Sequence, residues 1–329
     1  MKIAVFSTKP YDKDYFEKYD DKHEHQISYF DTALDEHTAN LTKDFDAVCI
    51  FVNDNADKDL IKLIAENGVK LIALRCAGYN NVDIDAAKEN GIKVVRVPAY
   101  SPEAVAEHAL ALIQTLNRKT HKAYNRIREG NFSLNNLMGF NLHKKTIGVI
   151  GTGIIGATFC KIMLGFGCKV VAYDIKESKE LVDLGVQFLN LKALFKASDI
   201  LSLHCPLNPE TKHIINSTSL NMMKDGVMII NTSRGGLIET SEVIDALSSK
   251  KIGFLGIDVY EQEENFFFKD LSESIIQDDL LLRLNSFPNV LITSHQAFFT
   301  KEAMHEITST TIQNFNDFEK GTELKNEVS

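Results

Sequence analysis

The segment Lys145–Asp174 constrains the fold of this chain more than any other part of the sequence. A short apolar run, Thr146–Ile150, is typical of a strand buried on both faces, and it leads directly into the glycine-rich segment Gly151–Gly156. Apolar residues at helical spacing follow, Gly167 ends the expected helix, and a second apolar run ends at Asp174. This order of strand, glycine turn, helix, strand and acid indicates a doubly wound, parallel α/β sheet.

The glycine pattern also indicates what this turn binds. Gly151, Gly153 and Gly156 have the spacing of a dinucleotide-binding turn, in which glycine lets the backbone approach a pyrophosphate at the amino end of a helix. Asp174, 23 residues after Gly151, stands where an acid accepts hydrogen bonds from the adenosine ribose hydroxyls. A tight turn that binds nothing is the alternative, and the flanking strand, helix and acid disfavour it.

Composition excludes several classes of protein. The 329 residues are enough for about two domains, and 44% hydrophobic with 25% charged residues is typical of a soluble globular protein. A net charge of −9 argues against a nucleic-acid or anionic-membrane surface. No apolar run approaches the roughly 20 residues of a membrane span, and a strand pattern that begins at Lys2 argues against a signal peptide.

Cysteine and histidine usage adds two expectations. The five cysteines show no C-x-x-C spacing, and their odd number in expected strands and helices indicates buried, reduced thiols in a cytoplasmic protein. The ten histidines show no metal-ligand spacing, so no metal site is expected. The cysteines are Cys49, Cys76, Cys160, Cys168 and Cys205.

The first hundred residues alternate between strand and helix patterns, which predicts a small parallel α/β sheet with its own core. Helical stretches such as Asp57–Asn67 and Ile84–Asn90 are each followed by a glycine. Ser101-Pro102-Glu103 then begins a helix that is expected to run to about Glu129 and to connect two domains. The expected strands are Lys2–Ser7, Gln26–Phe30, Ala47–Val52, Val69–Arg75 and Lys93–Val97.

A second alternation follows the glycine turn, in the order of a doubly wound nucleotide-binding domain. The tail from Phe299 onward has a helical pattern, and because it follows the last strand of the second domain we expect it to pack on the first. The prediction is a discontinuous domain, residues 1–99 and 299–329, and a dinucleotide-binding domain, residues 100–298. The further strands expected are Val186–Leu189, Ile200–Leu203, Val227–Ile230, Phe254–Val259 and Val290–Thr293, with helices at Leu191–Ala197, Ser217–Met223 and Ser241–Ser249.

Polar residues follow four of these strands, and the carboxyl ends of parallel strands meet at one edge of a sheet. His204, Arg234 and His295 each stand just after a strand, and an acidic loop follows another. Hydride transfer to a carbonyl needs a proton donor near neutrality, which histidine supplies, and a carboxylate on its second nitrogen would orient it. Arginine binds a substrate carboxylate through two parallel hydrogen bonds. The acids of the loop are Glu261, Glu263 and Glu264.

The pattern alone leaves alternatives open. Arg234 is equally consistent with a helix cap or an ion pair, and the three acids are equally consistent with a solvated charge run. His204 and His295 occupy similar positions, so spacing does not choose between them. The run Phe266-Phe267-Phe268 is more typical of a core under a loop than of an active-site lid.

At these residues the sequence resembles the D-isomer-specific 2-hydroxyacid dehydrogenases, and among them the fermentative D-lactate dehydrogenases. The resemblance implies a flavodoxin-like substrate domain and a Rossmann NAD-binding domain. It also implies that His295 is the acid/base, Glu263 its carboxylate partner and Arg234 the anchor for the substrate carboxylate. The matching segments, which span nearly the whole chain, are Arg75–Asp83, Val97–His108, Gly148–Gly156, Ser202–Leu207, Gly226–Gly235, Asp258–Glu263 and Val290–Phe298.

The resemblance assigns ligand contacts as well. Backbone amides at Ala77 and Gly78 are implied to hold the substrate carboxylate, with Tyr100 and Phe298 nearby. Thr211 stands where the lactate enzymes often have Asn, in a position that contacts adenosine. Besides the glycines of the turn, the implied NAD contacts are Ile154, Ile155, Asp174, Cys205, Pro206, Thr232, Ser233, Arg234 and Asp258.

The function that this resemblance implies is the reversible, NADH-dependent reduction of pyruvate to D-lactate by a cytoplasmic enzyme. The helix expected from Ser101 to about Glu129 is apolar on more than one face and indicates a subunit contact, and the expected assembly is a homodimer or a dimer of dimers through the NAD-binding domain. One alternative is the same chemistry on a bulkier 2-keto acid, with Phe51 as a pocket wall. A different class is an NAD-sensing, corepressor-like binding module. Such proteins usually carry disordered tails, whereas this chain starts in an expected strand and ends soon after an expected helix, which favours the enzyme.

Overall fold

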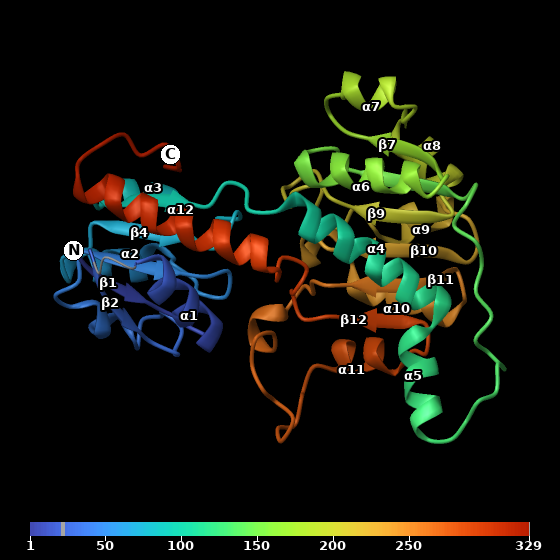
Figure 1. The fold of residues 1–329 in the computed structure, drawn as a ribbon, viewed down its shortest axis with the longest axis horizontal. Helices are drawn as coiled ribbons and strands as arrows, with labels where there is room; N and C mark the ends of the chain where they lie inside the picture. The colour runs from blue at the N-terminus through green and yellow to red at the C-terminus, as the bar shows by residue number, and fades with distance from the viewer. Residues whose placement is uncertain (21–23, 329) are drawn as a thin grey trace. The chain divides into compact units, whose positions relative to one another are not determined.

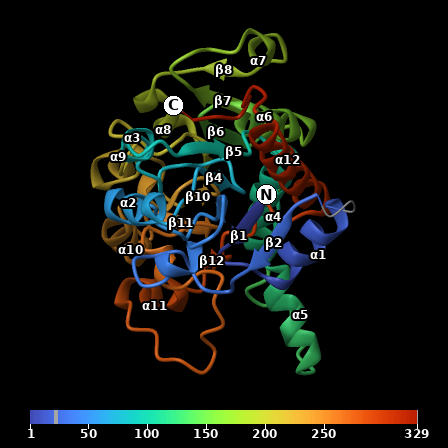
Figure 2. The same cartoon turned by 90° about the vertical axis from the view of Figure 1, so that its left-hand side faces the viewer.

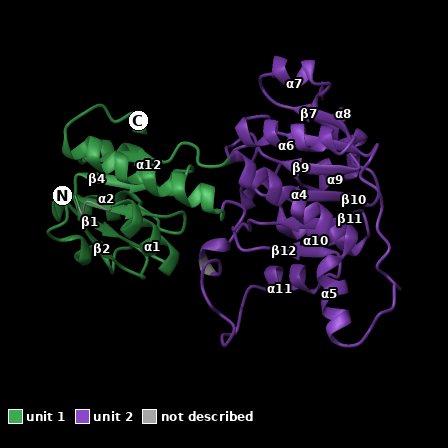
Figure 3. Cartoon of the chain, viewed as in Figure 1, with its two compact units in different colours: residues 1–101, 299–329 green, residues 102–298 purple. Residues whose placement is uncertain are grey.

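The structure is a computed structural model that describes residues 1–20 and 24–328. It divides into two compact units: unit 1 comprises residues 1–101 and 299–329, and unit 2 comprises residues 102–298 (Figure 3). Each unit contains one parallel β-sheet with helices on both faces. No described helix is long and apolar enough to span a bilayer.

Unit 1 is built on five parallel strands. Its elements are β1 (Lys2–Val5), α1 (Pro10–Tyr19), β2 (Gln26–Tyr29), η1 (Ala39–Thr42), β3 (Ala47–Ile50), α2 (Lys58–Glu66), β4 (Leu71–Leu74), α3 (Ile84–Glu89), β5 (Lys93–Arg96) and α12 (Lys301–Glu319). The strand order is β2-β1-β3-β4-β5, the order of flavodoxin-like folds. Successive strand residues alternate between two cores, because side chains in a strand point to opposite faces: Val5 packs with α1 and α12, whereas Ala4 packs with α2 and α3. The helices α1 and α12 lie side by side (Figures 1 and 2).

Unit 2 is built on seven parallel strands. Its elements are α4 (Pro102–Arg118), α5 (Thr120–Arg128), β6 (Thr146–Ile150), α6 (Ile154–Gly165), β7 (Lys169–Tyr173), α7 (Lys179–Asp183), β8 (Gln187–Phe188), α8 (Leu191–Ala197), β9 (Ile200–Leu203), α9 (Ser217–Met222), β10 (Val227–Asn231), η2 (Gly235–Leu237), α10 (Thr240–Ser248), β11 (Ile252–Ile257), η3 (Glu263–Asn265), α11 (Asp279–Ser286) and β12 (Val290–Ile292). The strand order is β12-β11-β10-β9-β6-β7-β8. Val149 of β6 packs with α4 and α6, and its neighbour Ile150 packs with the core formed by α8 to α11. The expected fold class, two doubly wound parallel sheets, is confirmed.

Every expected strand is present, but most are shorter than expected at the carboxyl end. The expected strand Lys2–Ser7 ends at Val5, and Ala47–Val52 ends at Ile50. The backbone turns away from the sheet at these points: Ser7 has a φ of 51°, and the amide of the residue after Ile50 donates to Asp54 Oδ2. Apolar pattern locates a strand, whereas side-chain hydrogen bonds in the following loop decide where it stops.

The single helix expected from Ser101 to about Glu129 is wrong. It is two helices, α4 and α5, separated by Lys119, whose φ of 52° lies in the left-handed region. The Lys119 side chain donates to the carbonyl of Asn136, 2.7 Å away, which ties the break to the following loop. The apolar face of α4 is buried through Leu116, whereas α5 has no buried residue. Because α5 buries no residue in the core of unit 2, nothing in that core requires it to continue the axis of α4.

All five cysteines are free and buried, as expected. Burial raises the pKa of the Cys49 thiol to about 12 and that of the Cys205 thiol to about 11. The pKa of the Cys160 thiol is raised to about 12 for the same reason. These thiols are protonated at neutral pH.

Candidate active site

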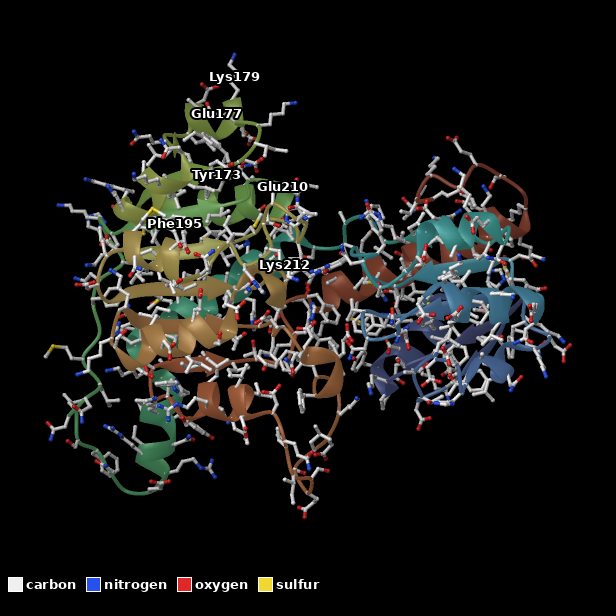
Figure 4. All side chains as sticks on the ribbon, turned by 180° about the vertical axis from the view of Figure 1, so that it is seen from behind. Tyr173, Glu177, Lys179, Phe195, Glu210 and Lys212 are labelled. Carbon is white, nitrogen blue, oxygen red and sulfur yellow. The ribbon has the colours of Figure 1, made fainter. Side chains whose placement is uncertain are left out.

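The carboxyl ends of the seven parallel strands meet at one edge of the unit 2 sheet, and the strand order reverses beside β6, which pairs with both β7 and β9. Ligands of open α/β sheets bind outside this edge, at the reversal point. In Figure 4, the labelled residues Tyr173, at the end of β7, and Glu210 and Lys212, on the loop after β9, lie here. The polar segments singled out in the sequence follow β6, β7, β9, β10, β11 and β12 at this same edge.

The glycine turn after β6 needs glycine for two separate reasons. Gly151 has a φ of 91°, and a Cβ at this position would lie 2.5 Å from the backbone nitrogen of Cys205. A Cβ on Gly156 would collide with the carbonyl oxygen of Gly151. A side chain at either position would collide with the backbone. Only glycine therefore lets the start of α6 pack against β6 and the loop after β9.

The amino end of α6 fits a dinucleotide. Its N-cap, Gly153, offers no side chain to the first amides of the helix, and a Cβ built on it would meet nothing within 4 Å. The next side chain, Ile154, is 65% exposed. The hydroxyl oxygen of Thr232, at the end of β10, is buried and has no hydrogen-bond partner among the described residues. An open helix amino end and an unsatisfied buried hydroxyl are what a bound phosphate-bearing cofactor would complete.

Asp174 lies at the end of β7, as the sequence predicts, and it is half-buried. Its Oδ2 accepts hydrogen bonds from the backbone amide of Thr152, at 2.5 Å, and from the Thr152 hydroxyl, at 3.0 Å. Its Oδ1 accepts from the amide of Lys176 at 3.3 Å. The carboxylate thus braces the glycine turn and places a negative charge beside it, which suits ribose hydroxyls and disfavours a phosphate.

The structure joins His295 and Glu263. The Nδ1 of His295 lies 2.7 Å from Oε1 of Glu263, and the two side chains are only 15% and 16% exposed. The second carboxylate oxygen, Oε2, accepts the backbone amide of Tyr260 at 3.0 Å, which fixes the orientation of Glu263. A carboxylate only accepts hydrogen bonds, so Nδ1 of His295 carries a proton and Nε2 is left to act on a ligand.

The other two acids of the loop have different surroundings. Glu261 lies 2.8 Å from Nε2 of His213 and also accepts the amide of Thr240 at 3.0 Å. The side chain of Glu264 is exposed, and its carbonyl accepts Nζ of Lys269. Of the three acids that spacing could not separate, Glu263 alone among the described residues has His295 as its partner.

His204 differs from His295 although both follow a strand of the same sheet. The Nε2 of His204 lies 2.9 Å from the hydroxyl oxygen of Ser202, and its ring lies against Phe159 with the ring centroids 4.9 Å apart. Burial lowers the pKa of His204 to about 3. This imidazole is neutral at physiological pH, and no described carboxylate stabilises a proton on it, so it is unsuited to the role of acid.

Arg234 follows β10 on a loop shaped by Asn231. The Asn231 side chain is fully buried; it donates to the carbonyl of Arg234 at 2.9 Å and accepts the amide of Ser233 at 3.0 Å. The Arg234 guanidinium donates to the Ser233 carbonyl at 2.7 Å and forms no ion pair with any described acid. A half-buried guanidinium without a carboxylate partner is available to bind an anion.

Asp258, one of the implied NAD contacts, follows β11 directly. The residue is 0% exposed, and its carboxylate accepts the Thr293 hydroxyl and the amides of Gln296, at 2.9 Å, and Ala297, at 2.8 Å. Burial raises the pKa of Asp258, but hydrogen bonds from His108 and Thr293 outweigh burial, and the net shift is downward. The carboxylate is therefore ionised and engaged within the protein.

Sequence reasoning missed three residues of this edge: His108, Asn231 and Thr293. His108 and Thr293 form hydrogen bonds with partners that are distant in the sequence. Asn231 is the buried last residue of β10, and its side chain shapes the loop that follows. The one available signal was that Asn231 and Thr293 are polar residues in otherwise apolar runs. His108, on α4, had no such signal.

The other residues that the resemblance implies for binding lie in the loops after β9 and β10, at the start of α6 and at the end of unit 2. Cys205 is buried, and its carbonyl accepts the hydroxyl of Ser233 at 2.7 Å, which joins the β9 and β10 loops. Pro206 is exposed, and its carbonyl accepts the hydroxyl of Thr211 at 2.6 Å. Ile155 is half-buried at the start of α6. Phe298, the last residue of unit 2, is 7% exposed.

The residues implied to bind substrate from the first hundred positions belong to unit 1. The carbonyl of Ala77 accepts Arg96 at 2.6 Å, and the carbonyl of Gly78 accepts the thiol of Cys76. No described residue accepts a hydrogen bond from the amides of Ala77 and Gly78, so both donors remain available to an anion. Tyr100 is half-buried in the segment after β5.

One group of metal-ligand type occurs among the described residues, although no spacing in the sequence indicated it. His213 lies between Glu239, 2.8 Å from Nδ1, and Glu261, 2.8 Å from Nε2. Because each ring nitrogen already faces a carboxylate, the three side chains are partners of one another, and they link the loops before α9, α10 and η3.

Comparison with known proteins places this geometry in a family. Residues 110–297 match the model of the D-isomer specific 2-hydroxyacid dehydrogenase NAD binding domain. The D-lactate dehydrogenase of Escherichia coli (strain K12) is 52% identical over 328 residues, which cover 100% of both chains. The apo-structure of D-lactate dehydrogenase from Escherichia coli covers 100% of both chains with a TM-score of 0.91 and 50% identity. D-lactate dehydrogenase from Aquifex aeolicus, complexed with NAD and lactic acid, covers 97% of this chain and 96% of its own with a TM-score of 0.86 and 33% identity.

The family model covers more than half of the chain, and the Escherichia coli relative matches it from end to end. Both comparisons point to the same group of enzymes. The chain belongs to the D-isomer specific 2-hydroxyacid dehydrogenase family.

Proposed function

We propose that this protein catalyses the reversible, NADH-dependent reduction of pyruvate to D-lactate, with His295 as the acid/base. The observation that carries the proposal is the half-buried His295–Glu263 pair at the carboxyl edge of the NAD-binding sheet. The names of the similar proteins, D-lactate dehydrogenases among them, support the choice of substrate.

The hydrogen bond between His295 and Glu263 determines which ring nitrogen can act on the substrate. Glu263 holds the proton on Nδ1, so the ring transfers the catalytic proton through Nε2. In the reducing direction the imidazolium donates this proton to the ketone oxygen, and in the oxidising direction the neutral ring removes it from the hydroxyl. The Glu263 charge stabilises the imidazolium, and its bond to the Tyr260 amide prevents the carboxylate from turning away.

Arg234 would anchor the substrate. Its guanidinium matches the two oxygens of a carboxylate, and Asn231 fixes the loop that carries it. The amides of Ala77 and Gly78, in unit 1, are proposed to donate to the same carboxylate, with Tyr100 and Phe298 as further substrate residues.

NAD would be held by the residues of the glycine turn, by Asp174 and by the loops after β9 and β10, and when bound it supplies or accepts the hydride. The buried hydroxyl of Thr232, which follows β10, has no hydrogen-bond partner among the residues that the structure describes. Asp258 acts on the turn of His295 through its own hydrogen bonds. In this assignment residues 100–298 form the NAD-binding domain, and residues 1–99 and 299–329 form the substrate domain.

We also propose that the chain works as a cytoplasmic homo-oligomer joined through unit 2. In support, five large apolar side chains are exposed in α5 and the loop after it, more than an isolated surface segment usually presents. These residues are Tyr124, Ile127, Phe132, Leu134 and Met138. Light scattering of the purified protein would give the mass of the assembly, and fractionation of the source cells would test the location.

One assay tests the proposed reaction. NADH oxidation by the purified protein is measured with pyruvate, 2-ketobutyrate, 2-ketoisocaproate, glyoxylate and hydroxypyruvate, and the products are resolved by chirality. The expected result is the highest kcat/KM for pyruvate and D-lactate as its product. A preference for 2-ketoisocaproate would move the assignment to a bulkier substrate, with Phe51 as the first pocket residue to change. NADH binding without turnover of any substrate would leave a binding module instead of an enzyme.

A further inference from the structure

We propose that His108 is a positioning residue for His295, acting through Thr293 and the buried carboxylate of Asp258. His108 belongs to α4, far from the other two in sequence and outside every loop that follows a strand. Its Nε2 lies 3.1 Å from the Thr293 hydroxyl oxygen and 3.4 Å from Oδ1 of Asp258. The inference rests on the proposed function, because it assigns His108 a part in placing the acid/base.

The directions of the hydrogen bonds follow from the donors available. The Asp258 carboxylate only accepts, so the single hydroxyl proton of Thr293 is donated to it. The Thr293 oxygen then has only acceptor capacity left to offer, so Nε2 of His108 must be the donor. The network requires a proton on Nε2 of His108.

The other side of Asp258 holds the turn that carries His295. The carboxylate accepts the amides of Gln296, at 2.9 Å, and Ala297, at 2.8 Å, and the Asp258 carbonyl accepts the amide of His295 at 2.7 Å. His295 itself has a φ of 51°, in the left-handed region that a residue with a side chain rarely adopts. Such a backbone persists only where its surroundings impose it, and here Asp258 supplies three of the restraining hydrogen bonds.

The rigid element behind this network is α4. This helix of 17 residues packs along α6 and against β11 and β12, and the His108 side chain is 17% exposed. The hydrogen bond from His108 therefore holds Thr293 at a fixed place relative to α4. Thr293 in turn holds the Asp258 carboxylate, which holds the turn that carries His295. Catalytic geometry tolerates little displacement, so losing this restraint should slow the chemical step more than it weakens binding.

The test uses matched pairs of variants. His108→Phe keeps an aromatic ring but removes the donor, whereas His108→Gln places an amide N–H close to the position of Nε2. Thr293→Val removes the hydroxyl at nearly constant shape, and Thr293→Ser keeps it. His121→Phe, on α5, is the control for replacing a histidine outside the network. For each variant kcat and KM for pyruvate, the Kd for NADH and the Tm are measured.

We expect His108→Phe and Thr293→Val each to lower kcat by about ten- to a hundredfold, with the NADH Kd changed by less than about twofold. His108→Gln and Thr293→Ser should restore most of the lost turnover. The double variant should cost little more than either single change, because both break one network. Equal kcat for His108→Phe, His108→Gln and wild type would overturn the proposal, as would additive losses in the double variant.

A second measurement does not depend on turnover. In protein with ¹⁵N-labelled histidine, the Nδ1–H proton of His295 that is bonded to Glu263 is assigned by its disappearance in His295→Ala. This signal should shift or broaden in His108→Phe and return in His108→Gln. If the wild type reduced no 2-keto acid, the proposed function would fail by itself, and an unmoved signal in His108→Phe would refute the positioning role. If His108→Phe does not fold, the Thr293 pair carries the same test.

Discussion

The two halves of the carboxyl edge of unit 2 have opposite chemical characters. After β6, β7 and β9 the chain presents backbone amides, a glycine turn and the neutral His204. After β10, β11 and β12 it presents Arg234 and the His295–Glu263 pair. One sheet thus separates a half suited to hold a dinucleotide from a half suited to move a proton and hold a carboxylate.

The two histidines show what creates this difference. His204 comes directly after β9 and His295 three residues after β12, but their partners are a hydroxyl and a carboxylate. Burial without a carboxylate among its described neighbours lowers the pKa of His204 and leaves it neutral, whereas Nδ1 of His295 faces the carboxylate of Glu263. The strand that a histidine follows brings it to the site, and the hydrogen-bond partner of its ring determines whether it can donate a proton there.

The largest expected effect tests the division directly. His295→Ala should lower turnover by on the order of 10²–10⁴ while leaving NADH affinity nearly intact, because a positioned acid/base acts on the chemical step. His204→Gln should keep turnover within about tenfold of wild type, since a neutral imidazole supplies no proton. Steady-state kinetics and NADH fluorescence titration measure both. Comparable losses from both replacements would abolish the distinction between the two halves.

The next effect concerns substrate binding. Arg234→Lys keeps the charge but loses the paired hydrogen bonds to a carboxylate, so the KM for pyruvate should rise about ten- to a hundredfold. The Kd for NADH should stay nearly the same. Pyruvate kinetics that match wild type, together with a collapse of NADH affinity, would move Arg234 to the cofactor half.

A smaller and more specific effect is expected from Glu263→Gln. The amide keeps the size of the side chain but cannot stabilise the charged ring, so the imidazolium of His295 should lose its proton at lower pH than in wild type. The alkaline limit of pyruvate reduction, which needs the protonated ring, should move to lower pH. The acid limit of D-lactate oxidation, which needs the neutral ring, should move in the same direction. pH–rate profiles in both directions are the measurement.

Glu264→Gln is the matched control, because its exposed side chain lies in the same loop. It should leave both profiles in place. A Glu263→Gln profile that superimposes on wild type would mean that another acid orients His295, with Glu261 the first to examine.

The smallest expected effect lies in the other half of the edge. Asp174 should favour NADH over NADPH, because a 2′-phosphate would meet its carboxylate at close range. Asp174→Ala should reduce this preference by about tenfold, which corresponds to about 1.4 kcal/mol. Catalytic efficiencies with both cofactors measure it. NADPH as effective as NADH in the wild type would contradict the assignment of Asp174, and so would a change in the pH profile of Asp174→Ala.

Sequence reasoning located what depends on local pattern. The strands, the glycine turn and Asp174 at the end of β7 follow from apolar runs and from the conformational needs of glycine, and the structure contains all of them, although most strands end earlier than expected. The reasoning failed at Lys119, where a single left-handed residue divides one expected helix into two. Apolar pattern does not report that break, because the helix beyond it buries nothing.

The pairing of His295 with Glu263 was beyond the residues alone. Spacing offered two histidines and three acids, and the preference for His295 and Glu263 came from the family resemblance. The pairs form across loops 32 and 48 residues apart in the sequence, so only the folded sheet brings His295 to Glu263 and His213 to Glu261. Hydrogen bonds between segments distant in the sequence leave no periodic pattern, so nothing in the sequence indicates the contacts of His108.

The buried thiols have a consequence for how the protein withstands oxidation. Only a thiolate reacts readily with peroxide, disulfides or alkylating agents, and the thiols of Cys49, Cys160 and Cys205 are shielded and protonated at any pH at which a cell operates. Cys205 is notable because its backbone lies against Gly151 of the glycine turn. The native fold therefore keeps the Cys205 thiol unreactive. The rate at which Cys205 reacts with a thiol reagent would then report how often the loop after β9 opens.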